Sequence, residues 1–133
     1  MVITIVQDQS SEIRGRGYLV KQRAFIKLYL LTMIERKKDY AFNYLDEMKT
    51  ELHKFGYQPT HSEIYKALHE LTLDGVLYRT KKIKGDPRKD FQEIVLYRFT
   101  EEGYEKAQLY KKQMKAELDR CVGLLQKAIR DNY

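Results

Sequence analysis

Four polar side chains with hydrogen-bonding groups recur at helical spacing within one short stretch of the chain. They are Ser62, Tyr65, Lys66 and His69. At 100° per residue these positions share one side of an α-helix, and the apolar residues of the stretch share the other. Hydroxyl, ammonium and imidazole groups presented together can bond base edges in the major groove of duplex DNA. The polar side is a candidate base-reading face, and an ordinary solvated helix face is the alternative.

The same stretch carries its own start and stop signals. Thr60 and Glu63 have the spacing of a capping box, in which each side chain bonds the other residue's backbone amide, so a helix is predicted from His61. Asp74-Gly75 predicts its end, because glycine readily adopts the left-handed conformation beyond a helix terminus. An extended segment follows from Val76. A helix that leads directly into a β-ribbon is typical of a winged helix-turn-helix fold.

The segment after this helix is predicted to be a cationic hairpin. Gly85-Asp86-Pro87 marks a turn, and Phe91 to Phe99 is rich in the aromatic and β-branched residues that favour a strand. We expect this wing to lie along the DNA backbone or in the minor groove while the preceding helix enters the major groove. Its predicted DNA-binding residues are Arg79, Lys81, Lys82, Lys84, Arg88 and Lys89.

Two further helices are predicted upstream. The first runs from Val20 to Ile34, and the second is capped by Asp39, has apolar positions from Ala41 to Phe55 and ends at Gly56. Between residues 14 and 38 the only acid is Glu35, an imbalance that indicates an electrostatic footprint. The arm and first helix contribute the predicted DNA-binding residues Arg14, Arg16, Lys21, Arg23 and Lys27.

Residues 1–17 are predicted to form a flexible basic arm. Arginines between glycines, as in Arg14-Gly15-Arg16-Gly17, can reach into a minor groove. A frayed terminus with incidental charge is the alternative.

A long helix is predicted from Thr100 to about Ile129. Apolar residues follow alternating steps of four and three along it, which is the pattern of a coiled-coil seam. A partner copy would cover the seam in a homodimer; the alternative is a helix folded back onto its own domain. The predicted interface comprises Tyr110, Met114, Leu118, Cys121, Leu125 and Ala128.

Composition narrows the class of protein. The 133 residues carry a net charge of +6, which favours an anionic partner such as nucleic acid over an anionic membrane. No apolar run approaches the roughly 18 residues of a membrane span, no signal peptide is indicated, and a single cysteine suits a reducing compartment. The histidines and the cysteine lack metal-ligand spacing, and no nucleotide-binding or nucleophile motif is present. We therefore expect no cofactor, no metal, no membrane partner and no enzymatic activity, and a cytoplasmic, nucleoid-associated protein.

Three stretches resemble a known family. They are Gly17 to Phe25, His61 to Leu71 with Asp74-Gly75, and Leu109 to Gln113 continued by Glu117 to Cys121. Together they resemble the replication terminator proteins of Bacillus-type bacteria. The resemblance implies a winged-helix homodimer joined by antiparallel pairing of its last helices, with Cys121 in the seam. It also implies binding to double-stranded DNA at terminator sites, two dimers for each site, and arrest of replication forks from one direction.

The predicted fold class is therefore α+β, a winged helix-turn-helix with a long C-terminal dimerisation helix. Residues 1–17 would form the arm, residues 18–99 the DNA-binding domain and residues 100–133 the antiparallel coiled-coil helix. A winged-helix transcriptional repressor shares every feature read from the residues, and only the resemblance separates it from a fork-arrest protein, with its possible contact to a replicative helicase. A dimeric protein-binding adaptor is a third interpretation, one that would not need the basic wing.

Overall fold

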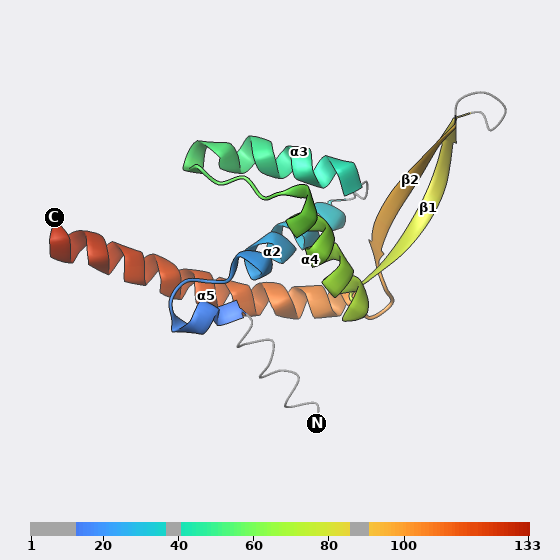
Figure 1. Ribbon diagram of the computed structural model, residues 1–133. Helices are drawn as coiled ribbons and strands as arrows, with labels where there is room; N and C mark the ends of the chain where they lie inside the picture. The colour runs from blue at the N-terminus through green and yellow to red at the C-terminus, as the bar shows by residue number, and fades with distance from the viewer. Residues whose placement is uncertain (1–12, 37–40, 86–90) are drawn as a thin grey trace.

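A three-helix body carries a two-stranded ribbon and a long helix in the computed structural model, which describes residues 13–36, 41–85 and 91–133 (Figure 1). The body consists of α2 (Gln22–Glu35), α3 (Ala41–Leu52) and α4 (His61–Leu73), with short 3-10 turns at Gly15–Gly17 and His53–Phe55. The ribbon pairs β1 (Leu77–Gly85) with β2 (Phe91–Phe99), and α5 (Gly103–Asn132) ends the chain. The predicted α+β winged-helix order is confirmed. Asp39, Arg88, Lys89 and residues 1–12 lie outside the described residues.

The core lies where α2, α3 and α4 meet. Leu30 and Leu31 of α2, Tyr44 of α3 and Leu68 of α4 have no exposed surface. Burial of a large apolar side chain stabilises the fold by about 1.5–3 kcal/mol, so this cluster holds the three helices together. The base of the ribbon joins the same core through Leu77 and Tyr97.

The predicted start and stop of α4 are confirmed. The Thr60 hydroxyl accepts the Glu63 amide at 3.2 Å, and the Thr60 amide donates to Glu63 Oε2 at 3.0 Å. Gly75 has a φ of 76°, and the Val76 amide donates back to the Leu71 carbonyl at 3.0 Å. The helix is thus fixed at both ends, and the chain turns directly into β1.

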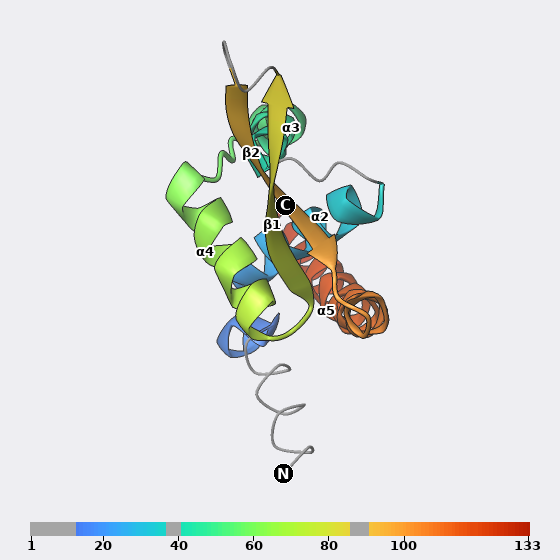
Figure 2. The ribbon, with the colours of Figure 1, turned by 90° about the vertical axis from the view of Figure 1, so that its right-hand side faces the viewer.

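The ribbon is an antiparallel pair in continuous register from Leu77 opposite Phe99 to Gly85 opposite Phe91. Nine residues at about 3.4 Å each give strands roughly 30 Å long, so the ribbon extends well beyond the body. Figure 2, turned by 90°, shows α4 and α5 on opposite sides of its base.

Two sequence-based predictions about packing are wrong. Phe55, predicted on the apolar stripe of the second helix, is 74% exposed, because the chain tightens into a 3-10 turn after Leu52 and rotates the residue off the stripe. In addition, residues 13–17 are not a free arm. Ile13 is buried, and Gly15, Arg16 and Gly17 adopt positive φ angles that turn the chain back towards α2. The two glycines serve a turn there.

The long helix divides into a packed half and a projecting half. Met114 is fully buried, Cys121 is 7% exposed, and Tyr110 donates to the Ala24 carbonyl at 3.0 Å. These three predicted seam residues therefore pack within their own chain, and Leu118 is half-buried beside them. Leu125 and Ala128 are exposed, on the part of α5 that extends away from the body in Figure 1. The alternative prediction, a helix folded back onto its own domain, therefore holds for the first half of α5 only.

Gly103 permits the close approach of α5 to the base of the ribbon, and replacing it tests this packing. A Cβ there would lie 1.9 Å from the Val76 carbonyl oxygen, whereas a Cβ at Gly123 meets nothing within 4 Å. Gly103→Ala should therefore destabilise the protein by about 1–3 kcal/mol or more, as overpacking does. Gly123→Ala, the matched control, should be neutral or stabilising by up to about 1 kcal/mol. Urea unfolding at one protein concentration measures both, and equal stabilities would contradict the packing described.

Candidate nucleic-acid interface

The exposed side of α4 forms an open groove of about 450 Å³. All four predicted base-reading side chains, Ser62, Tyr65, Lys66 and His69, are exposed and line it, together with Arg23 and Glu70. The apolar residues Ile64, Ala67, Leu68 and Leu71 are buried on the other side of the helix. The structure thus brings the predicted set together on one surface. His61 stacks on Tyr65 with ring centroids 5.2 Å apart and extends the surface towards the start of the helix.

Glu70 is a residue of this groove that the sequence analysis did not single out. Its carboxylate pairs with the Arg23 guanidinium and lies 3.2 Å from the Lys27 ammonium, so α4 is tied to α2 by charge as well as by apolar packing. The signal was present in the sequence, because Glu70 follows Lys66 by four residues and must share its side of the helix.

The pairing with Glu70 corrects one predicted DNA contact. Lys27 is only 2% exposed and its ammonium is held against Glu70, so it cannot reach a phosphate from this position. Arg23 is about one third exposed and borders the groove, but it too is paired with Glu70. A buried ammonium needs a paired carboxylate, which explains the arrangement.

The wing presents its cations along exposed β1. Arg79, Lys81, Lys82 and Lys84 are all exposed, and Lys81 forms a cross-strand ion pair with Glu93 at 3.1 Å. Such an exposed pair contributes little to stability and leaves the lysine able to exchange partners.

Tyr97 lies at the base of the wing, near Arg79 of β1 and Tyr65 of α4. Burial raises the pKa of its phenol above the ordinary value, while a hydrogen bond and charge from Arg79 act in the opposite direction and the neighbouring Tyr65 adds to the rise. The base of the wing therefore lies beside the groove.

The remaining predicted cations lie near the start of α2. Lys21 and Arg16 are exposed, whereas Arg14 pairs with Glu117 of α5 at 3.4 Å. Arg14 is thus attached to the long helix.

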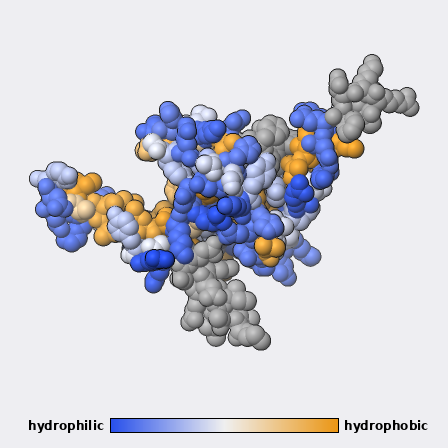
Figure 3. Space-filling model, in the orientation of Figure 1, coloured by the Kyte–Doolittle hydropathy of each residue, from blue (hydrophilic) through white to orange (hydrophobic). Residues whose placement is uncertain are grey.

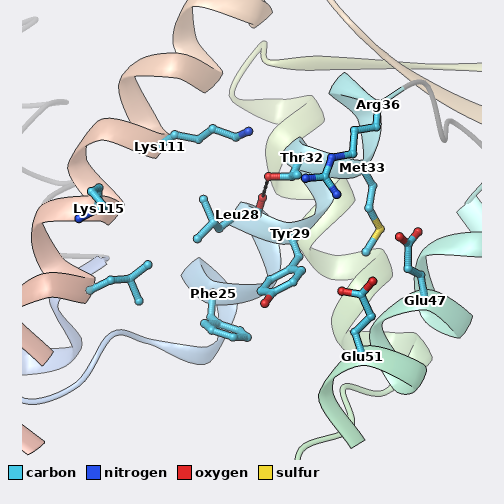
Figure 4. Close-up of a pocket in the computed structure, with 11 residues that line it drawn as sticks. Phe25, Leu28, Tyr29, Thr32, Met33, Arg36, Glu47, Glu51, Lys111 and Lys115 are labelled. Carbon is cyan, nitrogen blue, oxygen red and sulfur yellow. Dashed lines mark hydrogen bonds between the residues drawn. The ribbon is translucent and has the colours of Figure 1, made fainter. Parts of the chain in front are cut away.

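A second cavity, of about 430 Å³, lies over α2 between α3 and α5 (Figure 4). Phe25, Leu28, Met33 and Leu118 give it an apolar lining, and charged residues such as Glu47, Glu51 and Lys115 surround these. In Figure 4 the α4 ribbon passes behind α2, so this cavity is separate from the groove on α4.

The described residues were also compared with the requirements of a metal site and of a membrane-spanning helix. Across residues 13–36, 41–85 and 91–133 there is no cluster of three or more His, Cys, Asp or Glu side chains able to hold a metal ion. None of the helices in those ranges is long and apolar enough to cross a membrane.

Three helices, an exposed polar face on the third of them and a cationic ribbon after it define a winged helix-turn-helix protein. Residues 17–133 match the replication terminator protein family. The chain belongs to that family, and the resemblance noted in the sequence is confirmed.

Curated relatives agree with this assignment. The replication termination proteins of Bacillus subtilis (strain 168), Bacillus spizizenii and Bacillus vallismortis are each 49% identical to this chain over 117 residues. That alignment covers 88% of this chain and 93% of each relative. The family and these relatives assign the chain to replication termination.

Lys66 lies on the exposed face of α4 and Lys82 on the wing, so replacing each of them tests the predicted roles in base reading and backbone binding. Lys66→Ala should cost roughly 1–3 kcal/mol at a preferred duplex and relax specificity there. Lys82→Ala should weaken binding to all duplexes alike and lower the slope of log affinity against log salt by about one. Titrations of preferred and random duplexes at several salt concentrations measure both. Equal weakening of the two duplexes by Lys66→Ala would contradict its role in base reading.

Proposed function

We propose that this protein binds double-stranded DNA at replication terminator sites as a homodimer and arrests forks that arrive from one side. In this proposal α4 enters the major groove and the wing lies along the backbone. The observation that carries it is the exposed set Ser62, Tyr65, Lys66 and His69 in one groove beside the cationic β1. The family supplies the process in which such binding would act.

Charge supports duplex DNA as the ligand. The net charge is +6, and the lysines and the arginine of β1, the strand that follows α4, are exposed. Cations that neutralise phosphates release condensed counterions, so affinity for duplex DNA should fall with salt at a slope of about −0.9 per contact. A dimeric adaptor for other proteins would show no such dependence on DNA.

The projecting half of α5 supports a homodimer. Val122, Leu125 and Ile129 are 51%, 44% and 62% exposed and follow steps of three and four. Figure 3 shows hydrophobic residues along this end of the molecule, at the left of the view. Leu118 lies one helical turn before Val122 and lines the apolar cavity over α2. The apolar surface of α5 therefore continues onto the body. The antiparallel α5 of a second copy would cover it.

Charge placed in this stripe should separate the dimer. The double variant Leu125→Lys, Ile129→Lys removes from each chain two apolar side chains that the proposed dimer would bury, worth roughly 1.5–3 kcal/mol each, and adds repulsion. The dimer dissociation constant should rise about 100-fold or more, with loss of tight binding to two half-sites. Gly123→Lys, at an exposed position on the opposite side of α5, is the matched control. Sedimentation measures both, and a double variant that still sediments as a dimer would place the interface elsewhere.

Arrest from one direction needs an asymmetry, because a symmetric dimer on a palindrome presents the same face to both sides. Two dimers bound unequally at one terminator would supply it, with the more slowly released dimer facing the approaching fork. A contact made with the replicative helicase on one side only would be a second source.

Strand displacement on a terminator placed in each orientation tests this polarity. We expect the cognate helicase to be blocked in one orientation and to pass in the other, because the faces it meets differ. An unrelated helicase is the control: its polar arrest indicates slow release, and its free passage indicates a specific contact. Equal displacement from both ends at saturating protein would contradict polar arrest. A winged-helix transcriptional repressor would then remain, and its chromosomal sites would lie at promoters.

A further inference from the structure

The segment from Ile13 to Tyr18 is fastened to α5 at the point where that helix leaves the body. Ile13 is 1% exposed and packs in a cluster with Ala24 of α2 and Met114 of α5. Val20, Leu28 and Leu118 pack around this cluster. One side chain thus fills the space between the first helix of the winged domain and the long helix.

Polar contacts fasten the same segment one to two turns further along α5. Arg120 donates to the Gly17 carbonyl at 3.2 Å and to the Tyr18 carbonyl at 2.6 Å. Its Nε lies 2.8 Å from Glu117 Oε2, and Arg14 pairs with the other oxygen of Glu117. The hydrogen bond from Arg120 is the main reason that the pKa of Glu117 lies below its ordinary value.

The backbone is shaped for this attachment. Gly15 and Gly17 have φ angles of 59° and 86°, and a Cβ on Gly15 would lie 3.3 Å from the Val20 carbonyl carbon. The Lys21 amide donates to the Ile13 carbonyl at 3.3 Å and closes the turn. The segment therefore forms a fixed bridge from α2 to α5. Ile13 and Arg14 precede residue 17, where the match to the family begins.

The bridge is the last described contact between the body and α5. Beyond Cys121 every residue of the helix is exposed, and the helix extends for 11 more residues to Asn132. At 1.5 Å per residue this is a lever of about 17 Å, whose end moves about 3 Å for a tilt of roughly 10°. That displacement is close to one base-pair step of B-DNA, about 3.4 Å.

We propose that residues 13–18, together with Glu117 and Arg120, form a clasp that fixes the angle of α5. In a dimer joined through the ends of α5, this angle sets the separation of the two copies of α4. Ile13 and Arg120 are thus positioning residues for the spacing of DNA half-sites. The inference rests on the proposed dimeric DNA binding.

The reactivity of the Cys121 thiol tests the clasp in the absence of DNA. Its thiol is buried beneath the segment, with Sγ 3.9 Å from the Tyr18 carbonyl oxygen. Ile13→Asp and Arg120→Ala should each raise the rate of alkylation of this thiol in the full chain, and Ile13→Val should not. The Leu125→Lys, Ile129→Lys variant, whose clasp is intact, should react as slowly as the unmodified protein. Fast reaction there alone would show that a partner copy covers Cys121 and would overturn the clasp.

The spacing of half-sites tests the positioning role. Duplexes would carry two inverted copies of a half-site, selected from a random library, at a series of separations around one helical turn. The unmodified protein should prefer one separation by on the order of tenfold, since half-site spacing mirrors dimer geometry. Ile13→Asp and Arg120→Ala should flatten that preference while keeping the affinity for a single half-site and the dimer. Ile13→Val should retain the preference. Arg120→Ala leaves the apolar cluster intact, so it still tests the positioning role if Ile13→Asp fails to fold.

The outcomes separate this inference from the function on which it rests. An unchanged spacing profile in variants whose Cys121 has become reactive would overturn the positioning role alone. Failure of the unmodified protein to bind a half-site, or to prefer any separation, would overturn the proposed dimeric binding and the clasp's role with it.

Discussion

One face of α4 packs against α2, and both the exposed groove and the wing take their positions from this contact. Ile64, Ala67, Leu68 and Leu71 are buried there, so the opposite side of the helix must face outwards. The pairing of Glu70 with Arg23 and Lys27 adds a charged tie between the same two helices. Because only three residues separate the end of α4 from the start of β1, fixing the helix also fixes the base of the wing. The groove and the cationic strand thus keep one relative orientation.

Charge in this molecule has two separate uses. The cations of β1 and of the exposed face of α4 face solvent, whereas Arg14, Arg23 and Lys27 pair with carboxylates of other elements and hold those elements together. Glu35 likewise holds elements together. It was the only acid in a long basic stretch, and it binds Lys111 at 2.9 Å and Gln108 at 2.6 Å, both on α5. Counting basic residues along the chain therefore overstates the cationic surface that is exposed.

The long helix combines a structural part with a part suited to association. Its first half completes the core of its own domain and accepts the clasp, and its second half exposes an apolar stripe beyond the body. An apolar repeat that is continuous in sequence is thus divided in space at Cys121. Apolar side chains are stabilised both by burial within their own chain and by burial against a partner chain. The periodicity of the sequence alone does not distinguish these two kinds of burial.

Elements that depend on neighbours along the chain could be predicted from the sequence. The capping box of Thr60 and Glu63, the glycine stop at Gly75, the two-faced helix between them and the strands beside the turn all rest on local geometry, and the structure has them. The partners of charged side chains from distant segments could not be predicted in this way, because they are set by the packing of the helices. Lys27 is buried because Glu70, 43 positions away, lies across from it, and Arg14 binds Glu117, 103 positions away. Such pairs depend on how helices cross, which no local pattern specifies. Some cations of the basic stretch between residues 14 and 38 therefore hold elements together instead of facing solvent.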